Sequence, residues 1–355
     1  MNPREGRPRA LFANAGNSNA LSIFSLERAS MKSSYAVAGL FAALLALPLS
    51  APSAQENYPS KPIRWVVGYP AGGGTDVLAR NVGSQLAVEL GQPVVIENRP
   101  GAAGIIAGDH VAKAVADGYT IMTGDNGMLV YNPALYKDLS YRPDTDYKPV
   151  GLMAKIHLLL ITHPESGIKD GKELLAAMKA NPGKFYYATP GSGSPHHLAM
   201  ELFKDETGID AVHVPYKGGA AAINDLMGGH VPLMLLDLPS GAGAVRSGKV
   251  VPLVSFSSER IEQLKDVPTM GELGYPEVEA YAWSGVVVPN QTDDAIVDRL
   301  NTALVQSLAH EDVRKRMYEA GQDPIPGTPQ DMADYMKQET QKWHKLIADR
   351  QITIE

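Results

Sequence analysis

Apolar and polar positions in the first third of the chain follow two periods, one typical of strands and the other of helices. Residues 63–69 form a mostly apolar run that predicts a strand. Four aliphatic residues from Leu78 to Leu90 then recur at every fourth position, which is the spacing of one helix face, and Gly91 follows as a residue that often ends helices. The same patterns predict strands at 94–96 and 119–123, with a helix of small residues at 102–115 between them.

The alternation begins again after the apolar run at 158–161. Strands are predicted at 185–188, 212–214, 233–236 and 251–256, and helices at 173–179, 197–206, 220–227, 294–308, 313–320 and 329–347. Strand–helix alternation with short connections predicts α/β architecture with mostly parallel sheets and helices on both faces. Because 355 residues exceed what one hydrophobic core usually organises, we expect two domains.

Composition removes several functional classes. The chain has no cysteine, which excludes disulfides, cysteine-ligated zinc, iron–sulfur clusters and thiol nucleophiles. Its formal net charge of −7 argues against nucleic-acid binding. An anionic small ligand stays compatible with that charge, because a local site can oppose the sign of the whole molecule. The histidines show no zinc-protease spacing, and we expect neither a metal nor a cofactor.

A segment beginning at Met31 has the three zones of an export signal. A short basic start is followed by the uncharged run 35–49, which is rich in Ala and Leu, and by small residues at 50–54. The apolar run is shorter than the ~20 residues that span a bilayer, and no later stretch reaches that length. We therefore expect residues 31–54 to be a cleaved signal peptide and residues 1–30 to be an upstream extension before the true start.

Two glycine-rich loops each connect a predicted strand to a predicted helix. We call Pro70-Ala71-Gly72-Gly73-Gly74-Thr75-Asp76 the first glycine-rich loop and Thr189-Pro190-Gly191-Ser192-Gly193-Ser194-Pro195 the second. The first backbone amides of a helix lack intrahelical partners, and glycine lets an anion approach them. Thr75, Ser192 and Ser194 add hydroxyl donors. Because there is one such loop in each half of the chain, we expect the two loops to bind one anion between them. Neither loop contains Lys or Arg, which favours a carboxylate over a phosphate.

Other interpretations of these residues remain open on sequence alone. A single glycine-rich turn is more often structural than functional, and Asp76 has the simpler role of a helix cap, with ligand contact as an addition. Neither loop carries a dinucleotide or phosphate-loop fingerprint. Ser192 and Ser194 do not fit the nucleophile motif G-x-S-x-G, yet a secreted hydrolase using one of them with a nearby histidine is the alternative from another class.

Several ordered motifs resemble the Bug family, the periplasmic substrate-binding proteins of tripartite tricarboxylate transporters. Besides the two glycine-rich loops, the matching segments are Tyr58-Pro59-Ser60-Lys61-Pro62-Ile63, Glu97-Asn98-Arg99-Pro100-Gly101-Ala102, Asn132-Pro133-Ala134-Leu135-Tyr136, Val214-Pro215-Tyr216-Lys217-Gly218, Asp266-Val267-Pro268-Thr269 and Gly274-Tyr275-Pro276. They cover the chain in order from Tyr58 to its C-terminus.

The resemblance implies a two-lobed type II periplasmic binding protein that is not an enzyme. We expect lobe 1 at residues 57–158 plus 284–355, lobe 2 at 159–283, and two crossover strands between them. A carboxylate ligand would lie between the lobes, held at Ala71, Gly72, Gly73, Gly74, Thr75, Asp76, Thr189, Ser192, Gly193 and Ser194, with Asn126, Tyr216, Asp237 and His197 as further candidates. The monomeric protein would deliver an organic acid to a membrane transporter, or alternatively dock on a signalling membrane protein.

Overall fold

The computed structural model describes residues 58–354. The predicted signal peptide at 31–54 and the predicted upstream extension at 1–30 lie outside these residues. Within the described part of the chain, no helix is both long enough and apolar enough to cross a bilayer.

The first elements follow the predicted alternation closely. They are β1 (Ile63–Val67), α2 (Gly74–Leu90), β2 (Val94–Asn98), η2 (Ala102–Gly104), α3 (Ile105–Ala112) and β3 (Thr120–Asp125). Helix α2 ends at Gly91, whose φ of 67° is the left-handed conformation that glycine adopts without steric cost. The helix predicted at 102–115 is shorter, because φ is positive at Ala103 (52°) and Gly104 (84°) and regular α-helix begins only after them.

A series of short helical segments then leads into one long strand. The segments are η3 (Gly127–Tyr131), which is a π-helix, α4 (Asn132–Leu135) and α5 (Pro143–Asp146). Strand β4 (Tyr147–Thr162) follows and has 16 residues. No strand was predicted here. The apolar run at 158–161 is only its last part, because Lys148, Lys155 and His157 interrupt the apolar pattern before it.

The middle of the chain forms a second set of strands and helices. Its elements are η4 (Pro164–Ser166), α6 (Gly171–Ala180), β5 (Phe185–Thr189), α7 (Pro195–Thr207), β6 (Ala211–Pro215), α8 (Gly219–Met227), β7 (Leu233–Asp237), α9 (Leu238–Arg246), β8 (Val251–Ser255), η5 (Glu262–Leu264) and η6 (Gly271–Leu273). The last elements are β9 (Tyr281–Pro289), α10 (Asp294–Ala309), α11 (Glu311–Glu319), β10 (Gln322–Pro324) and α12 (Pro329–Asp349).

The strands lie in the order β2-β1-β3-β9-β4-β7-β5-β6, and β8 and β10 also pair with β4. We call β1, β2, β3, β9 and β10 the first strand group, and β5, β6, β7 and β8 the second. Strands β1, β2 and β3 pair in parallel, as do β5, β6 and β7. Each antiparallel pairing involves β4 or β9. The α/β class is therefore confirmed, with a sheet that is mixed rather than uniformly parallel.

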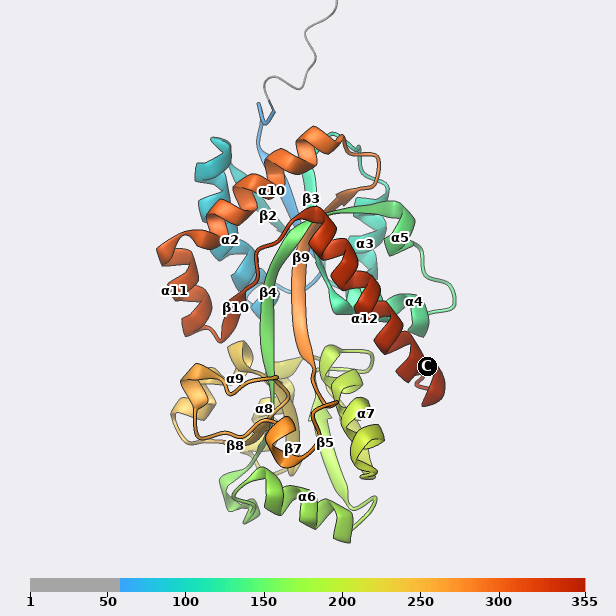
Figure 1. Ribbon diagram of the computed structural model, residues 1–355, viewed down its shortest axis with the longest axis vertical. Helices are drawn as coiled ribbons and strands as arrows, with labels where there is room; N and C mark the ends of the chain where they lie inside the picture. Colours follow the sequence, from blue (N-terminus) through green and yellow to red (C-terminus); the bar gives the residue numbers. More distant parts are fainter. Residues whose placement is uncertain (1–57, 355) are drawn as a thin grey trace, which may run out of the picture. The chain divides into compact units, whose positions relative to one another are not determined.

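Strand β4 connects the two groups (Figure 1). Its residues Tyr147–His157 pair with β9, and its residues Leu158–Thr162 pair with β7. The chain thus leaves the first group through β4, builds the second group, and returns to the first group through β9, which lies beside β4 in the middle of Figure 1.

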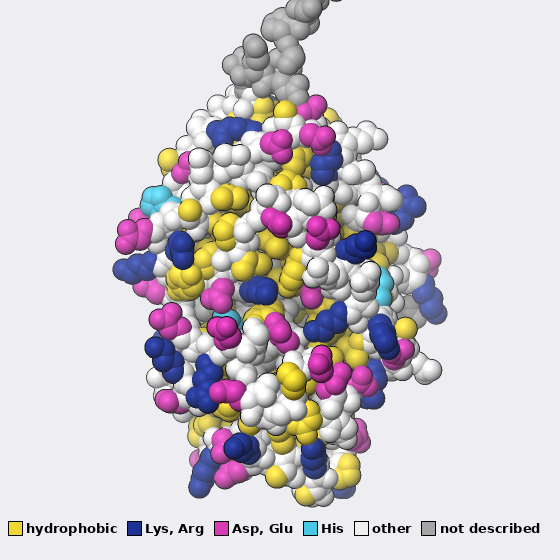
Figure 2. Space-filling model, in the orientation of Figure 1, with side chains coloured by type: hydrophobic (Ala, Val, Ile, Leu, Met, Phe, Trp, Pro, Cys, Tyr) yellow, Lys and Arg dark blue, Asp and Glu magenta, His cyan; other side chains and the backbone are white. Residues whose placement is uncertain are grey.

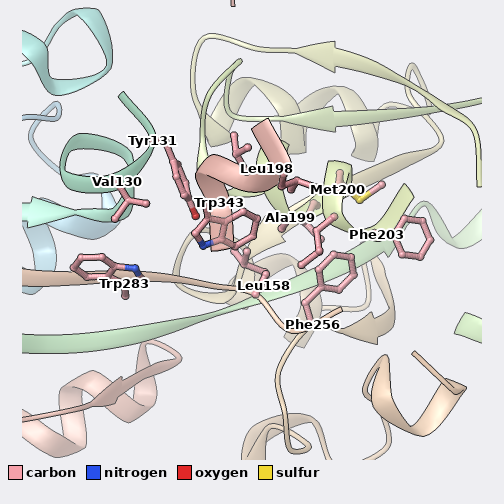
Figure 3. Packing of buried hydrophobic residues seen from close by; sticks show 14 of the residues in the cluster. Val130, Tyr131, Leu158, Leu198, Ala199, Met200, Phe203, Phe256, Trp283 and Trp343 are labelled. Atoms are coloured by element: carbon pink, nitrogen blue, oxygen red, sulfur yellow. The ribbon is translucent and has the colours of Figure 1, made fainter. Parts of the chain in front are cut away.

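Helix α12 packs against β4 and α7 through a shared apolar core that also contains Trp283 of β9. The Trp343 ring meets Tyr131 edge to face, with ring centroids 5.4 Å apart. Figure 3 shows Trp343 beside Leu198 and Ala199 of α7, and all of them belong to one buried cluster. The indole N–H groups of Trp283 and Trp343 both donate to the Glu339 carboxylate, at 2.9 and 3.0 Å. This core fixes α12 against β9 and α7 together.

Charged side chains are mixed over the face shown in Figure 2. Lys and Arg residues lie among Asp and Glu residues there, and no continuous basic area is formed. That face therefore offers no extended surface for a polyanion.

Candidate functional site

Both glycine-rich loops leave the carboxyl ends of parallel strands. The first follows β1 and the second follows β5. Asn126 follows β3, and Asp237 ends β7. In open α/β sheets ligands bind beyond this edge, so the strand order alone places these residues where a site is expected.

The starts of four helices adjoin one another at this edge. A Cβ added to Gly74, at the start of α2, would lie 3.8 Å from Cβ of Pro239 in the first turn of α9. A Cβ on Gly219, at the start of α8, would lie 3.8 Å from Ser240 and 3.9 Å from Pro190. The first glycine-rich loop is thereby connected through α9 and α8 to the second loop, which opens α7.

Two of these helices have uncapped amides. Neither α2 nor α8 has a side-chain cap, and their N-caps are Gly73 and Gly218. Helix α7 is capped by Ser194, whose hydroxyl accepts the His197 amide, and α9 is capped by Asp237, which accepts the Ser240 amide. Free backbone donors in this region are therefore supplied mainly by α2 and α8.

Asp76 organises the first glycine-rich loop from behind. Its carboxylate is buried and accepts hydrogen bonds from the Gly72 amide (2.8 Å), Arg80 Nε (2.9 Å) and Asn98 Nδ2 (2.9 Å). Burial opposes ionisation, but these hydrogen bonds outweigh it and hold the pKa of Asp76 below its usual value. The helix-cap role expected for Asp76 is therefore wrong, because the N-cap of α2 is Gly73 and has no side-chain cap; Asp76 instead stabilises the loop through these hydrogen bonds.

Most polar groups of the second glycine-rich loop are already engaged within the protein. The Gly193 amide donates to His197 Nδ1 (3.2 Å), and the Ser194 hydroxyl donates to the Gly191 carbonyl (2.7 Å). The Thr189 hydroxyl accepts the Gly191 amide (3.3 Å). Ser192 is exposed, and no hydrogen bond joins it to another described residue. Ser192 is therefore the polar residue of this loop that a ligand can engage.

The remaining candidates in the first loop are accessible. Ala71, Gly72 and Gly73 are exposed, and Thr75 is half-buried with no side-chain hydrogen bond to another described residue. These residues surround the uncapped start of α2.

Asp237 and Tyr216 are close to the helix starts but have internal partners. The Asp237 carboxylate accepts the Ser240 amide at 2.9 Å and lies 3.2 Å from His196 Nε2. Burial opposes ionisation of Asp237, yet the His196 and Ser240 contacts hold its pKa below the usual value. The Tyr216 hydroxyl donates to Asp225 in α8 at 2.8 Å. Asp237 therefore fixes the start of α9, whereas Tyr216 is held by the last turn of α8.

Asn126 is separate from the loops and has an acceptor without a partner. Its Nδ2 donates to the Tyr131 hydroxyl (2.8 Å) and to the Tyr281 carbonyl (3.0 Å). Its Oδ1 is buried and has no hydrogen-bond partner among the described residues. Because the Tyr281 carbonyl can only accept, the amide orientation is fixed, and Oδ1 remains available. Next to it, burial raises the pKa of Asp125.

Sequence reasoning missed the start of α8. Gly218 and Gly219 follow β6 as the first loop follows β1, and this strand–glycine–helix pattern is the signal that could have identified them. His196 and His213 were also missed, because only the folded chain places them against Asp237 and Thr189.

The geometry does not support the hydrolase alternative. The Ser194 hydroxyl bonds to backbone atoms of Gly191 and His197, and neither Ser192 nor Ser194 contacts an imidazole nitrogen in the described part of the chain. A Ser257–His157–Asp323 row occurs near the crossover strands, with distances of 2.7 and 2.8 Å. However, Ser257 is only 3% exposed, and its hydroxyl is already hydrogen-bonded to His157. A substrate therefore cannot reach it.

No group of three or more potential metal ligands occurs in residues 58–354. The arrangement offers backbone amides and hydroxyls around a sheet edge between two strand groups, which is suited to noncovalent binding of a small anion. The fold is of the class of two-lobed periplasmic binding proteins.

Comparison with known proteins identifies the family. The family described as tripartite tricarboxylate transporter family receptor, TctC, matches residues 78–352. The chain is 36% identical to Protein BugT of Bordetella pertussis, over 88% of this chain and 96% of that protein. The chain therefore belongs to the TctC family of receptors, and the resemblance to Bug proteins is confirmed. The family consists of substrate-binding receptors, so this protein is not an enzyme.

Two solved structures of similar proteins contain carboxylates. Rpa4515 of R. palustris, solved with adipate, has a TM-score of 0.78 and 34% identity, covering 83% of this chain and 99% of that one. MatC of Rhodopseudomonas palustris, with bound malate, has a TM-score of 0.74 and 32% identity, covering 82% of this chain and 100% of that one.

Proposed function

We propose that this protein is exported to the periplasm, captures an organic acid by its carboxylate and delivers it to the membrane components of a tripartite transporter. The observation that carries the proposal is that the uncapped starts of α2 and α8 both adjoin the start of α9, with α8 also close to Pro190 of the second glycine-rich loop. Uncapped helix starts favour anions, and the two glycine-rich loops bring no cationic side chain, which suits a carboxylate. The dicarboxylates in Rpa4515 and MatC support this ligand class.

The ligand contacts follow from which donors are free. We assign direct contact to Ala71, Gly72, Gly73, Gly74, Thr75 and Ser192, together with the amides of Gly219, Ala220 and Ala221. Thr189, Gly193, Ser194 and Asp76 hold the loops. Asp237 holds the start of α9, and Tyr216 bonds to the last turn of α8. The unpartnered Asn126 Oδ1 is assigned to a hydrogen-bond donor of the ligand or to a water beside it.

Binding is proposed to work by lobe closure without bond making or breaking. Lobe 1 comprises residues 57–158 and 284–355, and lobe 2 comprises 159–283. The sheet supports this division, because β4 changes partners between His157 and Leu158. A ligand that contacts amides of α2 in one lobe and of α8 in the other stabilises the closed form over the open one. We propose a monomer.

A thermal-shift screen followed by calorimetry tests the ligand class. Adipate and malate are the first probes, within a wider panel of organic acids, and dimethyl adipate is the matched control without charge. We expect a carboxylate at 100 times its Kd to stabilise the protein by about 2.7 kcal/mol, and the diester neither to bind nor to be hydrolysed. Equal binding of acid and diester would contradict the carboxylate site.

N-terminal sequencing of periplasmic material tests the export part of the proposal. The three zones from Met31 to residue 54 predict a mature start between Ala51 and Asn57. Recovery of residues 1–50 on the periplasmic protein would contradict both the signal peptide and the start at Met31.

A further inference from the structure

Two stacked histidines lie directly behind the second glycine-rich loop. The rings of His197, in α7, and His213, in β6, have centroids 4.0 Å apart and planes 11° apart. Tyr187 of β5 also stacks on His213, with ring centroids 5.1 Å apart and planes 20° apart. All three belong to elements that carry the loop or neighbour it in the sheet. We call Tyr187, His213 and His197 the aromatic column.

Each histidine of the column is bonded to a different part of the loop. His197 Nδ1 accepts the Gly193 amide at 3.2 Å. His213 Nε2 lies 2.6 Å from the Thr189 hydroxyl, which in turn accepts the Gly191 amide. Gly193 has φ of 73°, a conformation that needs local support and favours glycine. The column therefore holds both ends of the short stretch that contains Ser192.

The geometry requires one tautomer of His197. A backbone N–H can only donate, so His197 Nδ1 must be unprotonated, and the ring proton lies on Nε2. Burial, opposed by Glu201 and reinforced by Lys204, lowers the pKa of His197. Burial lowers the pKa of His213 to about 3, and electrostatic repulsion from His197 and Lys204 contributes to this decrease. Both rings are thus neutral at neutral pH, as the Gly193 bond requires.

We infer that His197 and His213 are positioning residues, which hold the second glycine-rich loop in its ligand-ready form and do not bind the ligand themselves. This inference rests on the proposed function and replaces direct ligand contact as the role of His197. The column fixes Gly193 and Thr189 before any ligand arrives, so the Ser192 amide and hydroxyl are presented without an ordering cost at the moment of binding.

The first test compares His197→Asn with His197→Leu. The Asn Oδ1 can take the place of Nδ1 as acceptor, whereas Leu keeps bulk and loses the acceptor. By calorimetry with adipate and malate we expect His197→Leu to bind about tenfold more weakly than wild type, and His197→Asn to recover most of that loss. His310→Leu, at an exposed histidine, is the matched control and should bind as wild type does. Equal affinity of wild type and His197→Leu would overturn the inference.

The second test does not depend on a ligand. Imidazole ¹⁵N spectra of the free protein at pH 7 should show His197 as the neutral Nε2–H tautomer, and hydrogen exchange at the Gly193 amide should become about tenfold faster in His197→Leu. A charged or Nδ1–H His197, or unchanged exchange, would overturn the positioning role. If wild type binds no organic acid, the proposed function fails, while these two measurements still decide the role of the column.

Discussion

Neighbouring glycines of the first loop perform different tasks. Gly72 has φ of 82° and needs glycine for its backbone conformation, although a side chain there would meet only open space. Gly73 is the N-cap of α2, with φ −74° and ψ 164°, which any residue adopts. A Cβ on Gly73 would lie 3.3 Å from the Pro70 carbonyl oxygen, so a substitution there needs a small local shift but no unfavourable φ. Substitutions at Gly73 can therefore change the charge at the proposed anion site at little steric cost.

Gly73→Asp should separate folding from binding. Asp is a good N-cap, so the free energy of unfolding should stay the same or rise by a few tenths of a kcal/mol. A carboxylate about 4 Å from a bound carboxylate, at an effective dielectric constant near 20, costs about 4 kcal/mol, or roughly a thousandfold in affinity. Calorimetry with adipate measures this loss.

Gly73→Asn is the control for that substitution, because it has the same shape and capping ability without the charge. It should bind far more tightly than Gly73→Asp. If both variants bind within a few-fold of wild type, the anion does not lie at the start of α2.

The two serines of the second loop should respond oppositely to alanine. Ser194 caps α7, so Ser194→Ala should lower the free energy of unfolding by about 1 kcal/mol and change affinity little. Ser192 has no hydrogen-bond partner among residues 58–354, so Ser192→Ala should weaken binding of a carboxylate by about 1.5–3 kcal/mol and leave stability unchanged. Chemical denaturation and calorimetry on the two variants decide this. The reverse pattern would show that Ser194 contacts the ligand.

At the scale of elements, the aromatic column makes stability depend on pH. His213 has a pKa of about 3 when folded and an ordinary value of 6.5 when unfolded. Between these values the unfolded chain binds more protons, so acid favours unfolding. The melting temperature should therefore fall as pH decreases from about 6.5 to 4.5, a range that lies above most carboxylate titrations.

His213→Gln tests whether this residue is responsible. The variant removes the titrating ring and keeps a polar side chain near the Thr189 hydroxyl. Its melting temperature should change less than that of wild type between pH 6.5 and 4.5, and equal slopes would mean that His213 is not the group that takes up the proton.

Most elements could be predicted because their own residues carry a periodic apolar pattern. The stripe from Leu78 to Leu90 and the run at 233–236 are such cases, and both elements are confirmed. Strand β9 and helix α9 were not predicted from the sequence, each for a different reason. The apolar run Val286–Val288 is only part of β9, and α9 contains Pro239, Gly241 and Gly243, which weaken any helical pattern.

The candidate site could be predicted only in outline. The sheet edge and the two glycine-rich loops follow from strand–glycine–helix patterns. The patterns do not show which helix starts remain uncapped. That depends on the side-chain rotamers of Ser194 and Asp237 and on the His197 nitrogen that accepts the Gly193 amide. Such bonds are made between atoms that only the fold brings together.

At the scale of the whole molecule, the contact between Gly321 and Leu238 joins elements on either side of the crossover strand. Gly321 precedes β10, and Leu238 begins α9 directly after β7. Both β10 and β7 pair with β4. A Cβ on Gly321 would lie 2.5 Å from Leu238 Cγ, and φ at Gly321 is 72°. The backbone conformation and the close contact both require glycine.

Gly321→Ala should lower the free energy of unfolding by about 1–3 kcal/mol. The loss should be partly relieved in the double variant with Leu238→Ala, since the two closest atoms, Leu238 Cγ and Cδ2, are removed while Cβ at 2.8 Å and the positive φ remain. Gly243→Ala, within α9 and with no atom near its added Cβ, is the control and should not destabilise. Purely additive losses in urea denaturation would show that Leu238 does not cause the conflict.

The position of β9 constrains the order in which the chain can fold. β9 lies between β3 and β4, where Met122 is paired with Val287 and Lys155 with Trp283. During synthesis, β3 and β4 therefore appear long before the strand that fills the space between them. Contacts so distant in sequence form slowly, and a chain that still lacks residues 281–289 has two open strand edges. We expect the newly made polypeptide to remain unfolded until nearly all of it has been synthesised, which is the state that the proposed export across the inner membrane would require.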